Sequence, residues 1–336
     1  MVKIAIAGGS GNVAREIIDA LLAVKKHDIL VLSRKEVPAG EAPQSITWVK
    51  ADYEDPKQLV QALQGVHTVL SFVSTVDDPA STAQKSLIDA AVEAGVKRFA
   101  PSEWATSSME HLGWYAYKAE IRRYLQDLNK DKKVLEYTLF QPGLFVNYFT
   151  HPHQSSRHVH SMEMTIDFAN RRAILLDGGD DDYLTLTTVQ DVANVVARAV
   201  DFEGEWPVVG GIRGTDVTIR QLVALGEKVR GRSNYSTKYK KVLIFSELGG
   251  APFKIERVKA QDLESGAWKT SWVPKLDHPS IPPEQVDVFS RVIVVGFLRA
   301  IAAKAYNISD EWNRLLPDYK FTQAEEFLTG AWHGKP

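Results

Sequence analysis

The chain has 336 residues, 44% of them hydrophobic and 24% charged, which is ample for a packed core in two lobes or in one large domain with an insertion. A formal net charge of −2 provides no broad basic surface, and the longest apolar stretch, residues 292–303, contains Arg299 and is too short to span a bilayer. We therefore expect neither nucleic acid nor a membrane as a partner. The lack of cysteine excludes disulfides, thiolate metal sites and cysteine nucleophiles, and without a signal segment before residue 2 a cytoplasmic location is the expectation.

The first predicted strand, residues 2–7, runs directly into a glycine-rich segment that opens an amphipathic helix. A pyrophosphate binds bare backbone N–H groups at a helix N-terminus, where no Cβ blocks its approach. Gly8 suits the tight turn, Gly11 lets phosphates approach, and Ala14 lets the helix pack closely on the strand. The spacing GxxGxxA is a variant of the dinucleotide fingerprint, and an ordinary glycine turn is the alternative. We expect a dinucleotide to be bound by Gly8, Gly9, Ser10, Gly11, Asn12 and Val13.

The second predicted strand, residues 29–32, ends in Ser33, Arg34 and Lys35. An NAD-selective fold usually places Asp or Glu here to bind the adenosine ribose. Arginine suits a 2′-phosphate instead, because a guanidinium binds phosphate through two parallel hydrogen bonds. The position favours NADP over NAD, with a solvated basic loop as the alternative.

Strands and helices alternate through the first 150 residues. The predicted strands cover residues 2–7, 29–32, 46–50, 68–73, 98–101 and 136–140, and helices are predicted from residue 12 and over 56–63, 82–94 and 115–128. This alternation predicts parallel βαβ units in a doubly wound, Rossmann-type α/β sheet. Loops that follow parallel strands gather at one edge, so we expect one crevice to be lined, together with Gly11, by Asp52, Ser74, Ser102, Glu103, Gln141, Pro142 and Gly143.

Three of these positions have a specific expected contact. Ser74 can bond a cofactor ribose or phosphate and Asp52 the adenine amine, with a plain loop cap as an equal alternative for each. Backbone groups at Pro142 and Gly143 can reach the nicotinamide carboxamide, unless Pro-Gly only makes a turn there.

The regular alternation stops after residue 148. We expect residues 1–150 to form an NADP-binding domain to which 184–202 return, and residues 151–183 and 203–336 to form a smaller substrate-binding lobe. The segment 151–183 is predicted to be irregular, with a hairpin across Gly178, Gly179 and Asp180. Further helices are predicted over 189–200, 219–229 and 283–306.

Three segments resemble the NmrA-like and isoflavone-reductase-like branch of the atypical short-chain dehydrogenases, and they do so together with the glycine loop. They are residues 98–104 (RFAPSEW), 117–123 (YKAEIRR) and 137–145 (YTLFQPGLF). The resemblance extends more weakly through 188–193, 211–215 and 316–320. Members of this branch are NADPH-dependent reductases of phenolic and other secondary metabolites, or regulatory dinucleotide binders without known turnover.

The resemblance implies that Lys118 is the catalytic lysine that assists proton delivery. Two departures stand out: Trp104-Ala105 replaces the usual Phe-Gly beside the nicotinamide, and Trp114 occupies the position of the tyrosine in ordinary short-chain dehydrogenases. Apart from any family, a lysine in a cleft has its pKa lowered by desolvation and becomes a better acid or base near neutral pH, although an exposed helical lysine is the alternative. Tyr115 lies three residues before Lys118 on the same helix face and can replace the missing phenol or merely pack there. Tyr117 points about 100° away and is expected to pack or be exposed.

Four histidines, His151, His153, His158 and His160, fall within ten residues. A metal site needs convergent geometry that this segment does not promise, so we expect no metal and favour a surface loop, with a substrate contact as the alternative. The three acids Asp180, Asp181 and Asp182 are expected to form a solvated hairpin tip.

The sequence thus predicts an NADPH-dependent reductase, a monomer or homodimer, whose small conjugated or phenolic substrate carries an enone, ketone or imine. Lys118 assists proton delivery while orientation by the cleft contributes most of the acceleration. The alternative is a regulatory protein that senses NAD(P) without turnover.

Overall fold

The computed structural model describes residues 1–34, 46–73, 78, 80–231, 252–276 and 282–335. Within these ranges the principal sheet has six parallel strands in the order β3-β2-β1-β4-β5-β6. They are β1 (Lys3–Ala7), β2 (Asp28–Ser33), β3 (Ile46–Lys50), β4 (Thr68–Ser71), β5 (Arg98–Ala100) and β6 (Glu136–Tyr137). The strand order reverses between β1 and β4, as in a doubly wound Rossmann sheet, so the predicted fold class is confirmed.

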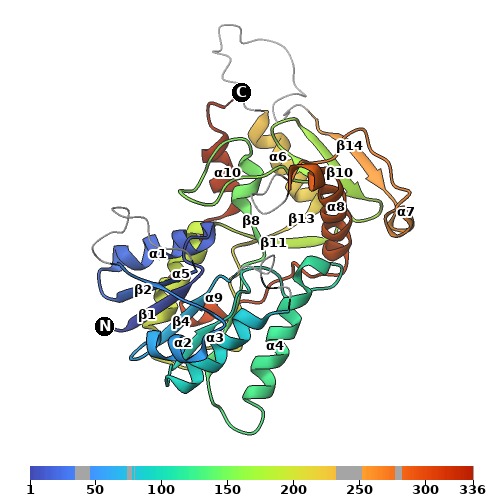
Figure 1. The fold of residues 1–336 in the computed structure, drawn as a ribbon. Helices are drawn as coiled ribbons and strands as arrows, with labels where there is room; N and C mark the ends of the chain where they lie inside the picture. Colours follow the sequence, from blue (N-terminus) through green and yellow to red (C-terminus); the bar gives the residue numbers. More distant parts are fainter. Residues whose placement is uncertain (35–45, 74–77, 79, 232–251, 277–281, 336) are drawn as a thin grey trace.

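Helices cover both faces of this sheet (Figure 1). One face carries α1 (Asn12–Val24) and α5 (Val189–Asp201), and the other carries α2 (Pro56–Ala62), α3 (Thr82–Glu93) and α4 (Ala116–Leu128). Alternation along β1 produces this arrangement, because Ile4 and Ile6 pack toward α1 and α5 while Ala5 and Ala7 pack toward the second group. All four side chains are buried, as expected for a parallel strand covered on both faces.

The predicted strand over residues 136–140 is interrupted at Thr138. The chain leaves β6 and continues as β7 (Leu139–Gln141), which pairs in parallel with β12 (Val209–Gly211). Phe140 of β7 stacks on Trp312 of α9 (Glu311–Leu315) with ring centroids 5.6 Å apart, and meets Trp206 edge-on at 5.7 Å. These three buried rings join the end of the sheet to a segment near the C-terminus.

The upper half of the molecule in Figure 1 consists of two small sheets and several helices. The sheets have the orders β14-β10-β9 and β13-β11-β8, and the helices α6, α8 and α10 enclose a core that includes Phe168, Leu222 and Phe297. The strands are β8 (Leu144–Phe145), β9 (Ile166–Asp167), β10 (Arg172–Leu176), β11 (Tyr183–Thr187), β13 (Thr215–Thr218) and β14 (Lys254–Val258). The helices are α6 (Ile219–Arg230), α7 (Ala260–Ser265), α8 (Val286–Ala302) and α10 (Ala324–Trp332), with short 3-10 helices η1 (Gly113–Tyr115), η2 (Val146–Thr150) and η3 (Pro283–Gln285).

The predicted hairpin across Gly178–Asp180 is wrong. A turn exists there, with Gly178 at φ +79°, but β10 pairs with β9 and β14 while β11 pairs with β8 and β13. The turn binds other elements: the Asp180 carboxylate accepts from Arg257 of β14 at 2.8 and 2.9 Å, and the Asp180 carbonyl accepts from the N–H of Arg220 in α6 at 2.9 Å. Asp180 is therefore an ion-pair partner of β14 and not part of a hairpin tip.

Residues 151–183 are also less irregular than predicted, because they contain β9 and β10.

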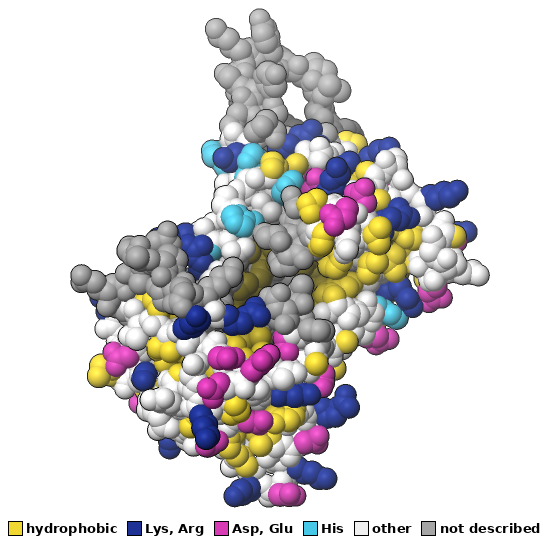
Figure 2. All heavy atoms as spheres, in the orientation of Figure 1, with side chains coloured by type: hydrophobic (Ala, Val, Ile, Leu, Met, Phe, Trp, Pro, Cys, Tyr) yellow, Lys and Arg dark blue, Asp and Glu magenta, His cyan; other side chains and the backbone are white. Residues whose placement is uncertain are grey.

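Acidic and basic side chains are interspersed over the face shown in Figure 2. In the described ranges, no helix has both the length and the apolar character needed to cross a bilayer. Helix α5 packs on α1. The assignment of residues 184–202 to the first domain stays a prediction. The division into two lobes at residue 150 stays a prediction.

Candidate active site

The glycine-rich segment forms the turn between β1 and α1. Gly8 has φ +76°, and a Cβ there would lie 2.6 Å from the backbone oxygen of Phe72; a Cβ on Gly9 would lie 2.6 Å from Cγ1 of Val31. Gly11 differs, because its Cβ would meet only the Gly8 oxygen, at 3.3 Å. Helix α1 begins after Gly11 with no side-chain cap, so the N–H groups of its first turn are available to an external acceptor. Donors and space together fit the pyrophosphate of a dinucleotide.

The candidate adenosine-binding residues follow β2 and β3. Ser33 ends β2, and the exposed Arg34 comes next, close enough to the buried Tyr53 to oppose the burial that raises the pKa of that phenol to about 12. Oδ1 of Asp52 accepts a hydrogen bond from the N–H of Glu54 at 2.9 Å, which is the loop-cap alternative. Contacts of Arg34 and Asp52 with a cofactor stay predictions, and Lys35 and Ser74 lie outside the described residues.

Lys118 is buried, not an exposed helical lysine, with 4% of its surface accessible. Its amine donates to the backbone carbonyl of Ser102 at 2.9 Å and to that of Glu103, in the loop that follows β5. Desolvation lowers the pKa of Lys118, an effect that Tyr115 and Glu103 oppose and Arg122 reinforces. The lysine therefore gives up a proton more readily than a solvated one.

Two aromatic rings flank the Lys118 amine. Nζ lies 4.6 Å from the ring centroid of Tyr115 and 5.1 Å from that of Tyr117, within the range of cation–π attraction. The expectation that Tyr117 points away from Lys118 was wrong. The ring does pack, as the alternative to exposure had it, with its centroid 6.5 Å from that of Tyr115. Burial raises the pKa of Tyr115, so its phenol stays protonated at neutral pH. The Lys118 amine contacts the ring of Tyr115 and not its hydroxyl, so the role of Tyr115 as a proton donor stays a prediction.

The Glu103 carboxylate is engaged by the protein itself. Arg122 donates to both carboxylate oxygens, from Nε at 3.0 Å and from Nη2 at 2.6 Å, and also to the carbonyls of Ser107 and Thr106. Only 1% of the Glu103 side chain is exposed. This charge-assisted pair occupies the carboxylate, while the Glu103 carbonyl accepts from Lys118 and its N–H donates to the Pro101 carbonyl at 2.7 Å. The expected contact of Glu103 with a cofactor stays a prediction.

A stacked pair of rings connects the glycine turn to the Lys118 loop. Trp104 stacks on Phe72 with centroids 4.4 Å apart and planes 8° apart, and its indole N–H donates to the Ser71 carbonyl at 2.8 Å. Phe72 is also the residue whose carbonyl a Cβ on Gly8 would strike. Phe72 and Trp104 therefore link the two halves of the candidate site at the carboxyl edge of the sheet.

The last residue of β7 and the two that follow it are used mainly inside the fold. The Pro142 carbonyl accepts from Thr187 Oγ1 at 2.7 Å, and the N–H of Gly143, at φ +75°, donates to the Ala105 carbonyl at 2.9 Å. Oε1 of Gln141 is buried and has no hydrogen-bond partner within the described ranges. Gln141 can therefore still offer an acceptor to a ligand, whereas these two backbone groups at Pro142 and Gly143 are already satisfied.

The histidine segment packs on α1. Oε1 of Glu16 accepts from the N–H groups of His158 and Val159 at 2.6 and 3.1 Å, and Nε2 of His158 lies 2.8 Å from Oδ2 of Asp19. The His153 ring meets Trp332 of α10 edge-on at 5.1 Å. His158 and His153 thus serve packing between elements, and in the described part of the chain no three potential metal ligands come together.

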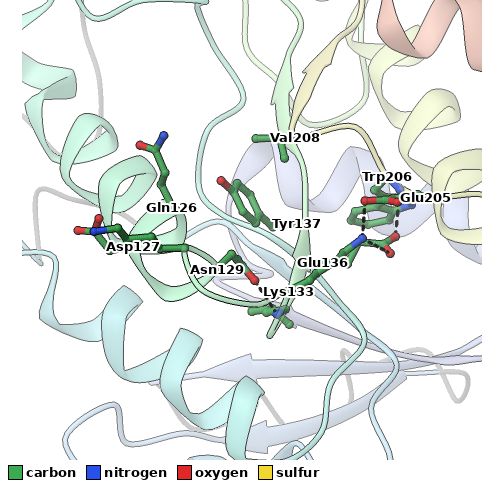
Figure 3. Close-up of a pocket in the computed structure, with 11 residues that line it drawn as sticks. Gln126, Asp127, Asn129, Lys133, Glu136, Tyr137, Glu205, Trp206 and Val208 are labelled. Atoms are coloured by element: carbon green, nitrogen blue, oxygen red, sulfur yellow. Dashed lines mark hydrogen bonds and ion pairs between the residues drawn. The ribbon is translucent and has the colours of Figure 1, made fainter.

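One cavity in the described part of the chain, of about 650 Å³, is shown in Figure 3. It is bounded by the C-terminal end of α4, by β6 and by residues 205–208, and Lys133 there reaches the carboxylates of Glu136 and Glu205 at 3.3 and 2.5 Å. None of the predicted site residues lines it. An open apolar groove of about 540 Å³ lies between η1 and α8, with Trp114 and Trp268 among its walls.

Sequence reasoning missed three residues of this site: Arg122, Phe72 and Gln84, whose Oε1 accepts from the Ser102 N–H at 2.7 Å. A signal existed for Arg122, which lies four residues after Lys118 and so on the same face of α4. Phe72 and Gln84 depend on contacts between distant segments.

Comparison with known proteins agrees with the fold and the motifs. A model of the NmrA-like family matches residues 2–262. Oxidoreductase BOA1 of Botryotinia fuckeliana (strain B05.10) is 31% identical over 234 residues, 69% of this chain and 77% of the relative, and oxidoreductase swnN of Metarhizium robertsii (strain ARSEF 23 / ATCC MYA-3075) is 27% identical with 99% and 98% covered. A solved structure of AtPrR2 with NADP+ and (+)pinoresinol superposes with a TM-score of 0.68 at 19% identity, covering 98% of each chain. The chain belongs to the NmrA-like family.

Proposed function

We propose that this protein is an NADPH-dependent reductase of a small conjugated or phenolic substrate, and that Lys118 is its catalytic residue. The observation that carries the proposal is the buried Lys118 amine, held by two backbone carbonyls at the sheet edge where the glycine turn also lies. The relatives named oxidoreductases support the class of reaction, and the NADP+ and pinoresinol in the similar structure support the cofactor and a phenolic substrate.

In this proposal the first turn of α1 holds the pyrophosphate and Arg34 the 2′-phosphate. The bound nicotinamide supplies the hydride. An ammonium has three N–H donors, and two of those on Lys118 go to the Ser102 and Glu103 carbonyls. The third delivers a proton, directly or through water, to the substrate atom that becomes negative. The rings of Tyr115 and Tyr117 exclude water from the amine and suit a flat substrate.

Turnover and cofactor binding are to be measured separately in Lys118→Ala. We expect NADPH affinity within a few-fold of wild type and turnover lower by about 10² to 10⁴, the usual contribution of a positioned general acid. Lys118→Arg should rescue little, because a guanidinium does not release its proton near neutral pH. Lys254→Ala, which removes an exposed lysine, is the matched control.

The substrate panel consists of enones, ketones and imines, with quinones among the enones, and of phenolic ethers as a separate class. Full turnover in Lys118→Ala would remove the lysine from the mechanism. Tight NADPH binding with no oxidation of the cofactor on any substrate would favour the regulatory alternative.

A further inference from the structure

We propose that the Glu103–Arg122 ion pair positions Lys118, by fixing the two backbone carbonyls that hold its amine. Glu103 and Arg122 are in this view positioning residues, and the inference rests on the proposed role of Lys118 for its meaning in catalysis. Nothing in the family match or in the names of the relatives assigns a role to this pair.

Two side chains of one helix hold the loop that carries these carbonyls. Lys118 and Arg122 are one turn apart on α4 and both reach the loop over residues 102–107. Lys118 binds the carbonyls of Ser102 and Glu103, while Arg122 binds the Glu103 carboxylate and the carbonyls of Thr106 and Ser107. The loop cannot move relative to α4 without breaking several of these bonds at once.

Because the ion pair is largely buried, removing either Glu103 or Arg122 is costly. The Glu103 carboxylate is almost fully buried and Arg122 is about a fifth exposed, so the loss of either partner leaves a poorly solvated charge close to Lys118. The pair is thus both a mechanical support and a local source of charge.

The charges act on Lys118 with opposite signs. The groups whose charges act on the pKa of Lys118 are Tyr115, the Glu103 carboxylate and the Arg122 guanidinium. The rings of Tyr115 and Tyr117 also lie 4.6 and 5.1 Å from its Nζ. The negative charge of Glu103 raises the pKa of Lys118 and the positive charge of Arg122 lowers it. While both are present the two effects partly cancel, and burial is left as the main influence.

This opposition gives a test that a purely structural role cannot imitate. Lysine labelled with ¹³C at Cε reports the pKa of Lys118 in the full-length protein by NMR titration, with Lys118→Arg to assign the resonance. Glu103→Gln should lower the pKa of Lys118 and Arg122→Gln should raise it, each by about one pH unit, the usual scale for a neighbouring charge. The double variant should return close to wild type.

The control is Glu120→Gln, on the same helix α4 as Lys118, which breaks a more exposed ion pair with Lys85 of α3 and should leave the pKa of Lys118 unchanged. Charge-conserving Glu103→Asp and Arg122→Lys serve if the glutamine variants do not fold. They should keep the pKa of Lys118 near wild type but lower kcat, with KM for NADPH unchanged, because the carbonyls that hold the amine shift.

No shift of the Lys118 pKa in either Glu103→Gln or Arg122→Gln would overturn the proposal, since the ion pair would then not act on the amine. For the charge-conserving pair, wild-type kcat would overturn it. The NMR readout does not need turnover. Opposite shifts combined with full activity of Lys118→Ala would therefore refute the proposed function and leave the positioning of Lys118 intact.

Discussion

Gly9 and Gly11 lie in the same turn, but substitution by valine should affect a different property at each. Gly9→Val should lower stability, and Gly11→Val should weaken NADPH binding. At Gly9 the new Cβ would lie 2.6 Å from Cγ1 and 3.3 Å from Cγ2 of Val31, a fully buried side chain of β2 that has nowhere to move. Overpacking of this kind typically costs about 1 to 3 kcal/mol, and the β-branched side chain puts Gly9→Val at the upper end. We expect a thermal midpoint lower by several degrees.

At Gly11 the backbone has φ −68° and ψ 152°, a conformation that any residue adopts, and the new Cβ would contact only the Gly8 oxygen. Gly11→Val should therefore fold normally but fill the space above the first turn of α1. Loss of two charge-assisted N–H contacts to phosphate, each worth about 1.5 to 3 kcal/mol, weakens NADPH binding by roughly 10² to 10⁴-fold.

The assay pairs a thermal melt by circular dichroism with a fluorescence titration of NADPH. Gly330→Ala is the control, because nothing lies within 4 Å of its Cβ position in α10. Wild-type NADPH affinity in Gly11→Val would show that the phosphates lie elsewhere, and an unchanged midpoint in Gly9→Val would refute the packing argument.

Two further predictions concern cofactor choice and acid stability. Arg34→Ala should narrow the preference for NADPH over NADH by about 1 to 3 kcal/mol in cofactor titrations, and equal affinities in the unmutated protein would contradict the assignment of Arg34 to the 2′-phosphate. Burial lowers the pKa values of His27 and His67, so below about pH 6.5 the unfolded chain binds protons that the folded chain does not, and stability falls as the pH falls. The thermal midpoint should drop between pH 7.5 and 5.5, and His27→Gln should reduce that drop. An equal drop in wild type and His27→Gln would show that His27 does not contribute to the loss of stability.

The sheet and the glycine turn could be predicted from the sequence, because both depend on local patterns of residues. The apolar runs that become β1 to β5 are bounded by turn residues, and predicted and observed limits agree within about two residues. The prediction failed where pairing is decided at long range. The Gly178-Gly179 turn has hairpin chemistry, yet β10 pairs with β14, about 80 residues away, and no local signal in the turn announces that partner.

The candidate site shows the same division. Lys118 was identified from its motif, and its burial follows from helix α4 packing against the sheet. The stacking of Trp104 on Phe72 joins loops that follow two different strands, and the placement of Tyr117 depends on the short η1 turn. Such contacts arise from tertiary packing, which the spacing of residues along one helix does not encode.

The ring column of Phe140, Trp206 and Trp312 bears on how the protein is made. Phe140 emerges from the ribosome some 170 residues before Trp312, yet their rings stack in the finished core. A nascent chain that has completed β7 still exposes the ring of Phe140, which Trp206 and later Trp312 cover. A chain that ends or stalls before Trp312 leaves an exposed aromatic surface on a sheet that is otherwise assembled. Such truncated products should be prone to aggregation and need chaperone protection.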